Sequence, residues 1–140
     1  MNTQPAVQRI VLIDDSENDN FFHEIALRKA GFDGDILVFE SGESALEFLL
    51  QDQIAVPTVV LLDINMPGMN GFDVARVLNE QLHPLAPLQL HMLTSSAWSE
   101  DKAAADAIGI IQNYVVKPLT PDMATGLLAQ ASNASCSQRV

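Results

Sequence analysis

Basic residues are scarce in this 140-residue sequence, in which seven Lys and Arg stand against eighteen Asp and Glu. The formal net charge of -11 repels phosphate backbones and anionic membrane surfaces. We therefore expect no direct binding to nucleic acid or to a membrane. A divalent metal ion or a cationic protein surface suits this charge better.

Cysteine is almost absent as well, because Cys136 is the only one and cannot form an internal disulfide. Such a chain is typical of a reducing compartment. Residues 1–8 contain no apolar segment like that of a secretory signal, and no apolar run reaches the roughly 20 residues that cross a bilayer. Together these absences predict a cytoplasmic protein.

The length and composition predict one compact domain. Hydrophobic residues make up 48% of the sequence and charged residues 18%, which favours a packed core over a disordered chain. We expect the domain to cover residues 8–131 and a flexible polar tail to cover residues 132–140. This division leaves no room for an output domain.

The apolar run at 58–62 is the centre of the pattern. It ends on Asp63 and is followed by a Pro-Gly turn at 67–68, as expected of a strand buried on both faces. Similar apolar segments alternate along the chain with helical patterns. Strands are predicted at 9–13, 35–39, 58–63, 88–93 and 112–116, and helices at 18–30, 41–50, 71–83, 100–107 and 120–131.

Five alternations of strand and helix indicate an α/β fold with a parallel sheet covered on both faces. The common arrangement is a flavodoxin-like, doubly wound five-stranded sheet with strand order 2-1-3-4-5 and five helices. Ligands of such sheets bind at the carboxyl ends of the strands, between the first and third strands. This order brings Asp14 and Asp15, which follow the first strand, beside Asp63.

Three adjacent carboxylates repel one another unless a cation binds or a pKa rises. Mg²⁺ fits such a site, because it prefers oxygen ligands and accepts carboxylates together with phosphate oxygens. The same strand order places Thr94 next to Asp63 and Lys117 beyond it. A hydroxyl and an ammonium beside a metal are suited to phosphoryl transfer, with Asp63 as the nucleophile.

Each of these residues also has a purely structural interpretation. Asp14, Asp15 or Ser16 could cap the following helix, and Thr94 and Ser96 could be helix caps or turn residues. Lys117 could be a solvated side chain at the end of a strand. A functional site is favoured because all of them stand at strand ends that the predicted topology places side by side.

With these residues in place, the chain resembles the receiver domain of two-component response regulators from about residue 8 to residue 130. The resemblance is carried by Asp14-Asp15, the motif LLDINMPGMNG at 61–71, Thr94-Ser95-Ser96, and the motif YVVKP at 114–118. It implies a receiver that is phosphorylated with the help of Mg²⁺.

The resemblance implies a role for each acidic residue of the pattern. Asp63 would be the phosphoacceptor, and Mg²⁺ would be held by Asp14, Asp15, Asp63 and the backbone carbonyl of Asn65. Asn65 and Ser96 would stand at the positions that tune dephosphorylation in the family.

The resemblance also implies that Thr94 and Lys117 contact the phosphoryl oxygens and that the peptide bond before Pro118 is cis. On phosphorylation, Thr94 would move and Tyr114 would turn inward. This switch would alter the face made by the fourth helix, the fifth strand and the fifth helix. Tyr114 could equally be an ordinary half-buried strand residue.

By the same resemblance, the phosphoryl donor is a sensor histidine kinase or a histidine phosphotransfer protein, and the output is a downstream protein bound at the switch face. The chain would be a stand-alone receiver and not an enzyme, since it would assist only its own phosphorylation and dephosphorylation. A homodimer is compatible with this function. One departure is an extra residue between Gly109 and Tyr114, which leaves the start of the fifth strand open.

Three other functions fit the same residues less well. A haloacid-dehalogenase-like phosphatase carries its Asp-x-Asp motif on the first strand, whereas Asp63 follows the third strand and Asn65 takes the second motif position. An FMN-binding module of the flavodoxin type needs a phosphate-binding loop where Asp14 and Asp15 would repel phosphate. A pseudo-receiver would bind partners without phosphorylation, and the complete set of site residues disfavours it.

Overall fold

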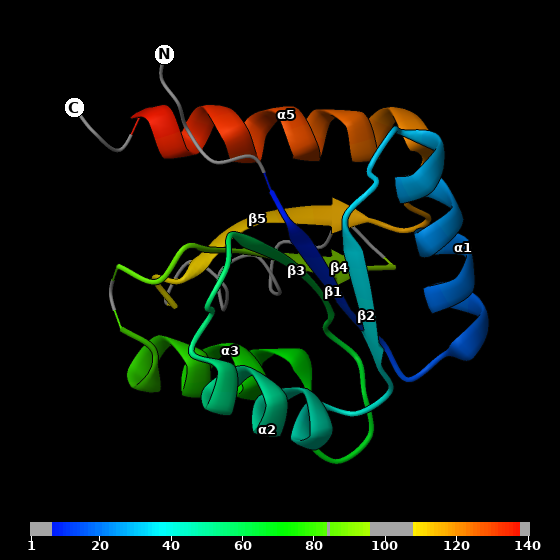
Figure 1. Cartoon of the computed structure of the whole chain (residues 1–140). Coiled ribbons are helices and arrows are strands. Elements are labelled where there is room, and N and C mark those ends of the chain that lie inside the picture. The colour runs from blue at the N-terminus through cyan, green and yellow to red at the C-terminus, as the bar shows by residue number, and fades with distance from the viewer. Residues whose placement is uncertain (1–6, 84, 96–107, 138–140) are drawn as a thin grey trace.

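The computed structural model describes residues 7–83, 85–95 and 108–137, with side chains through residue 129. Strands and helices alternate along this part of the chain (Figure 1). The elements are β1 (Arg9–Ile13), α1 (Glu17–Lys29), β2 (Asp35–Phe39), α2 (Gly42–Asp52), β3 (Thr58–Asp63), α3 (Gly71–Gln81), β4 (Leu88–Thr94), β5 (Ile111–Val116) and α5 (Pro121–Ser137). The helix predicted at 100–107 lies outside the described residues.

The five strands form one sheet in the order β2-β1-β3-β4-β5, and all neighbouring strands are parallel. This confirms the predicted doubly wound sheet. Helices α2 and α3 lie together on one face of the sheet, and α1 and α5 lie together on the other (Figure 1). Because the strands are parallel, their carboxyl ends share one edge of the sheet.

Strands β1 and β3 are buried on both faces, as their apolar sequences predict. Alternate side chains of a strand point to opposite faces of the sheet. Val11 and Val60 therefore join the core beneath α2 and α3. Leu12 and Leu61 join the core beneath α1 and α5. Packing on both faces holds the ends of β1 and β3 rigidly beside each other.

Polar caps set the starts of three helices. The side chains of Ser16, Ser41 and Asn70 each accept a hydrogen bond from the backbone amide three residues further on, at 3.2, 3.1 and 2.9 Å. At α3 the cap is reciprocal, because the side chain of Asp73 also accepts from the amide of Asn70. These caps determine where each helix begins after the preceding strand.

The last helix is longer than the sequence analysis predicts. Its end was expected near residue 131, but α5 continues to Ser137. Neither Gly nor Pro stands between Leu127 and Ser137, so no residue in this stretch interrupts a helical backbone. Residues 132–137, expected as part of a flexible tail, therefore extend the helix.

The pairing of β4 with β5 shifts in register between Leu90 and His91. Gln112 is the unpaired extra residue and forms a β-bulge. It accounts for the additional residue that the sequence shows before Tyr114. Beyond the bulge the pairing is regular, which places Lys117 level with the end of β4.

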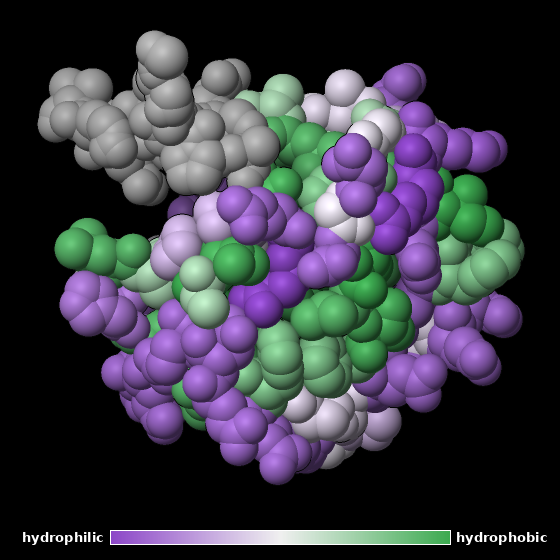
Figure 2. Space-filling view, in the orientation of Figure 1, coloured by the Kyte–Doolittle hydropathy of each residue, from purple (hydrophilic) through white to green (hydrophobic). Residues whose placement is uncertain are grey.

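The surface combines charged regions with a few exposed apolar side chains. Figure 2 shows hydrophilic residues over much of one face and apolar residues over α1 at the right of the view. Phe21 and Phe22 of α1 are among the exposed large apolar residues. Among the described helices, none has the length and apolar character that crossing a membrane requires.

Gly71, the first residue of α3, lies very close to the end of β3. A Cβ atom added to it would lie 2.4 Å from the carbonyl oxygen of Asp63 and 2.9 Å from the Cα of Ile64. Both are backbone atoms and cannot rotate away. The amide of Gly71 also donates a hydrogen bond of 2.9 Å to the carbonyl of Ile64. A side chain at this position would push α3 away from Asp63.

We predict that Gly71→Ala lowers the free energy of unfolding by about 1 to 3 kcal/mol, because the added methyl group overpacks a backbone contact. Gly126→Ala is the matched control, since a Cβ atom there meets nothing within 4 Å. Placed within α5, that change should raise stability by about 0.5 to 1 kcal/mol. Urea denaturation measures both. An unchanged midpoint for Gly71→Ala would contradict the close approach.

Candidate functional site

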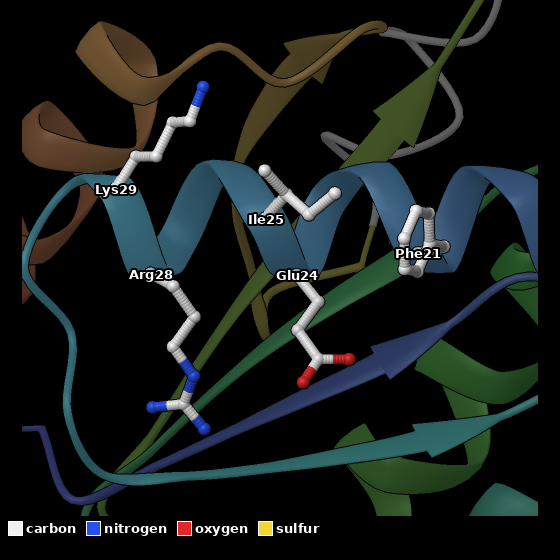
Figure 3. A pocket seen from close by; sticks show the side chains of 5 residues that line it. All are labelled: Phe21, Glu24, Ile25, Arg28 and Lys29. Carbon is white, nitrogen blue, oxygen red and sulfur yellow. The ribbon is translucent and has the colours of Figure 1, made fainter.

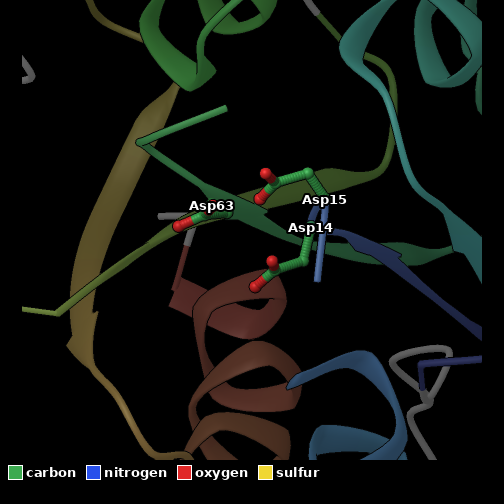
Figure 4. Close-up of side chains that lie close together, drawn as sticks. All are labelled: Asp14, Asp15 and Asp63. Carbon is green, nitrogen blue, oxygen red and sulfur yellow. The ribbon is translucent and has the colours of Figure 1, made fainter. Parts of the chain in front are cut away.

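Acidic side chains meet where β1 and β3 end. Asp14 and Asp15 follow β1, and Asp63 is the last residue of β3. One carboxylate oxygen of each lies within 4.8 Å of the others, and Figure 4 shows the three side chains close together. Asp14 and Asp63 are buried, whereas Asp15 is exposed. The predicted convergence of the three carboxylates is present in the structure.

Lys117 brings a positive charge to this cluster from the end of β5. Its Nζ donates hydrogen bonds to Oδ2 of Asp14 at 2.7 Å and to Oδ2 of Asp19 at 3.0 Å. It also forms an ion pair with Oδ1 of Asp63 at 3.2 Å. The ammonium is therefore shared among carboxylates from three different elements.

Asp19 was not predicted as a site residue. It lies in the first turn of α1, where an acidic residue is expected merely to favour the helix N-terminus. The sequence does offer one signal. Asp19 stands four residues after Asp15, in the first turn of the helix that begins at the site. A contact across 98 residues of sequence shows only in the folded chain.

Hydrogen bonds from both backbone and side-chain groups hold Asp14 in place. Its Oδ1 accepts from the amide of Ser16 at 2.9 Å, and its carbonyl oxygen accepts from Nδ2 of Asn20 at 2.9 Å. Its own amide donates to the carbonyl of Phe39 at the end of β2. The structural interpretation of Ser16 is also correct, because Ser16 caps α1. Of the residues that could have capped the helix, Ser16 is therefore the one that does so.

The end of β5 is tied to the end of β4 next to the site. The amide of Lys117 donates a 2.7 Å hydrogen bond to the carbonyl of Thr94, and the Lys117–Pro118 peptide bond is cis, as the resemblance implies. Thr94 is buried at the end of β4. Thr94 and Lys117 therefore stand side by side, beyond Asp63, as the strand order predicts.

The electrostatic balance differs between Asp63 and Lys117. Burial, and next the neighbouring charge of Asp14, raise the pKa of Asp63 to about 6, although Lys117 opposes the rise. Burial alone would lower the pKa of the Lys117 ammonium, but hydrogen bonds to Asp14 and Asp19 outweigh it and raise that pKa. At neutral pH both groups are therefore mainly charged, and the ionised form of Asp63 is destabilised by burial and by the charge of Asp14.

The remaining predicted residues lie around this centre. Asn65 is exposed, two residues after Asp63. Tyr114 is half-buried on β5 and packs against the core beneath α2 and α3. Ser96, predicted to tune dephosphorylation, lies outside the described residues. Asn65 thus follows the end of β3, and Tyr114 lies two residues before the end of β5.

The donor set fits a hard divalent cation. Three carboxylates within reach of one another offer oxygen ligands, which Mg²⁺ prefers over nitrogen or sulfur. The Lys117 ammonium neutralises part of the negative charge of the cluster. The carboxylates of Asp14, Asp15 and Asp63 would therefore suit one Mg²⁺ ion.

A depression lies on the outer side of α1, and Figure 3 shows five side chains of this helix around it. They are Phe21, Glu24, Ile25, Arg28 and Lys29. Only one of them is acidic, and none comes from a strand end. This depression is therefore separate from the acidic site.

Comparison with known proteins identifies the family. A family model described as the response regulator receiver domain matches residues 10–128. The DNA-binding response regulator MtrA of Mycolicibacterium smegmatis is 35% identical over 114 residues, which are 81% of this chain and 46% of MtrA. The chain thus spans about half the length of that relative. The chemotaxis protein CheY1 of Helicobacter pylori is 30% identical over 82% of this chain and 89% of its own length.

Solved structures give the same result. A two-component response regulator from Cytophaga hutchinsonii has a TM-score of 0.81 and 29% sequence identity, covering 91% of this chain and 98% of that one. A response regulator receiver protein from Dyadobacter fermentans has a TM-score of 0.75 and 30% identity, covering 88% and 96%. With the family match over most of its length, this chain belongs to the response regulator receiver domain family.

Proposed function

We propose that this receiver accepts a phosphoryl group on Asp63 and signals through contacts with other proteins. The observation that carries the proposal is the position of Asp63, whose carboxylate lies among Asp14 and Asp15 and 3.2 Å from the Lys117 ammonium. A nucleophile, a cation-binding cluster and a positive side chain are what phosphoryl transfer to a carboxylate requires.

In the proposed reaction, a carboxylate oxygen of Asp63 attacks the phosphorus atom of a phosphohistidine. The P–N bond breaks, and its electron pair leaves with the imidazole, which takes a proton from solvent. The product is an acyl phosphate on Asp63. Because the pKa of Asp63 is about 6, most of the carboxyl group is ionised and nucleophilic at neutral pH.

Charge neutralisation is the main contribution of the surrounding residues to this reaction. Mg²⁺, held by the three aspartates and the carbonyl of Asn65, supplies positive charge to the phosphoryl oxygens when bound. Lys117, 3.2 Å from Asp63, supplies a second positive charge, and Thr94 supplies a hydroxyl donor. The protein assists only its own phosphorylation and dephosphorylation and turns over no other substrate.

The switch follows from the neighbouring strands. Thr94 moves toward the phosphoryl group and Tyr114 turns inward, which changes the face formed by β5, α5 and the predicted fourth helix. A downstream protein binds this face, and the donor is a cytoplasmic kinase domain or a histidine phosphotransfer protein. The half-buried position of Tyr114 on β5 supports this proposal, because the side chain lies between the core beneath α2 and α3 and the solvent.

We further propose that the phosphohistidine partner docks on the exposed side of α1. Phe21 and Phe22 are 59% and 60% exposed, and their rings are 5.7 Å apart in an edge-on contact. Phe22 lies one turn beyond Asp19, which contacts Lys117. Exposed large apolar side chains beside a reaction site favour protein contact.

The central test is phosphorylation by acetyl phosphate with Mg²⁺, followed by intact-protein mass spectrometry. We expect one phosphoryl group that alkali or hydroxylamine removes on the wild type and none on Asp63→Asn. Lys117→Met should slow its formation about 100-fold, as the loss of an electrostatic contact to the reacting group does. Asp33→Asn, an exposed acid outside the site, should react normally. An adduct on Asp63→Asn would refute the assignment.

We also predict that Asp63→Asn raises the free energy of unfolding at pH 7.5 without Mg²⁺ by about 2 kcal/mol, since a pKa raised by burial marks a carboxylate destabilised when charged. The folded-state pKa of about 6 lies above the ordinary 3.8, so wild-type stability is lost as pH rises through 6. The advantage of the variant should therefore disappear below about pH 4.

Saturating Mg²⁺ should reduce the same difference at pH 7.5, because the cation stabilises the folded wild type and binds the variant weakly. Urea denaturation with and without Mg²⁺ measures both effects. If Asp63→Asn were no more stable than the wild type at pH 7.5, the carboxylates would not be under the strain that favours a metal ion.

Docking on α1 is tested by replacing Phe21 and Phe22 together with alanine. Phosphorylation by acetyl phosphate should keep its rate, since both rings are largely exposed and neither residue belongs to the acidic cluster. Transfer from a histidine phosphotransfer protein that phosphorylates the wild type should slow at least several-fold. Equal transfer rates for the variant and the wild type would place the donor elsewhere.

A further inference from the structure

The Lys117 ammonium has three carboxylate neighbours and three N–H donors. The oxygens of Asp14, Asp19 and Asp63 lie at 2.7, 3.0 and 3.2 Å from its Nζ. The side chain of Lys117 is only 16% exposed, so water competes little for these donors. The three carboxylates thus compete for one positive charge.

Each carboxylate oxygen of Asp14 already accepts a hydrogen bond. Its Oδ1 accepts from the amide of Ser16, and its Oδ2 accepts from Lys117. A divalent cation that binds either oxygen of Asp14 comes close to the Lys117 ammonium held by the same carboxylate, and the two positive charges repel. Cation binding is therefore favoured by anything that draws Lys117 away from Asp14.

Asp19 is placed to draw Lys117 away. It belongs to α1 and lies outside the cluster of Asp14, Asp15 and Asp63 that offers ligands to a metal. Its backbone is held by the cap of α1, because its amide donates to Oγ of Ser16 at 3.2 Å. The amide of Ser16 in turn donates to Asp14, so a ring of hydrogen bonds links these residues to Lys117. Asp19 therefore stays within reach of Lys117 whatever binds the cluster.

We propose that Asp19 is a positioning residue that holds Lys117 on the α1 side of the site and thereby strengthens Mg²⁺ binding to Asp14. The inference rests on the proposed function, which includes the Mg²⁺ site. It adds a residue that acts on the metal through Lys117 and not as a ligand. The side chain of Asp19 is 42% exposed, so its effect is that of a partly solvated ion pair.

The test measures the Mg²⁺ dissociation constant by isothermal titration calorimetry, without any phosphoryl donor. Asp19→Asn should weaken Mg²⁺ binding about threefold to fivefold, the scale of a partly exposed charge pair. Glu17→Gln is the matched control, because Glu17 lies in the same turn of α1, carries the same charge and is exposed. It should change the constant by less than about twofold, which separates a specific contact from net charge. Circular dichroism confirms that each variant is folded.

A double-mutant cycle separates action through Lys117 from a direct effect of Asp19 on the metal. Lys117→Met alone should strengthen Mg²⁺ binding, because it removes the competing ammonium. In that background Asp19→Asn should have no more effect than Glu17→Gln. The same loss with and without Lys117, or no gain from Lys117→Met, would overturn the inference.

The outcomes also separate this inference from the proposed function. If the wild type binds Mg²⁺ and Asp19→Asn binds it equally well, only the role of Asp19 is wrong. If the wild type binds no Mg²⁺, the proposed function fails and the role of Asp19 fails with it.

Discussion

The repulsion among carboxylates at the ends of β1 and β3 is the constraint around which this receiver is built. Asp14, Asp15 and Asp63 are held within 4.8 Å of one another, and two of them are buried. Burial and the charge of Asp14 raise the pKa of Asp63, so the ionised cluster is costly unless positive charge is near. Lys117 supplies one such charge within the chain. The negative charge that Lys117 does not neutralise makes the site suited to a cation and to the transfer of a charged group.

The scaffold keeps this costly cluster together by rigid packing. β1 and β3 are buried on both faces, so their ends cannot separate to relieve the repulsion. Gly71 lets α3 begin against the backbone of Asp63, and the bulge at Gln112 lets β5 deliver Lys117 level with the end of β4. Fold stability is thus used to hold a chemically strained arrangement, a common property of functional sites.

Helix α1 connects the acidic cluster to the surface. Its cap joins Ser16 to both Asp14 and Asp19, and Asp19 reaches across to Lys117. The next turn exposes Phe22 to solvent. A partner that packs on this helix would therefore lie close to the residues that position the ammonium. In the proposed function, the same element would serve partner contact and the electrostatics of the site.

The sequence by itself determined the fold class, the strand order and the convergence of Asp14, Asp15 and Asp63, because buried parallel strands have continuous apolar runs and their ends share one edge. It also determined the positions of Thr94 and Lys117 at their strand ends. Only the tertiary structure decided that Gln112 forms a bulge, that α5 continues to Ser137, and that Asp19 binds Lys117. The bulge depends on pairing register and the Asp19–Lys117 ion pair on a contact between distant segments, and neither has a local pattern in the sequence. The absence of Gly and Pro after Leu127 permits the longer helix but does not by itself determine where it ends.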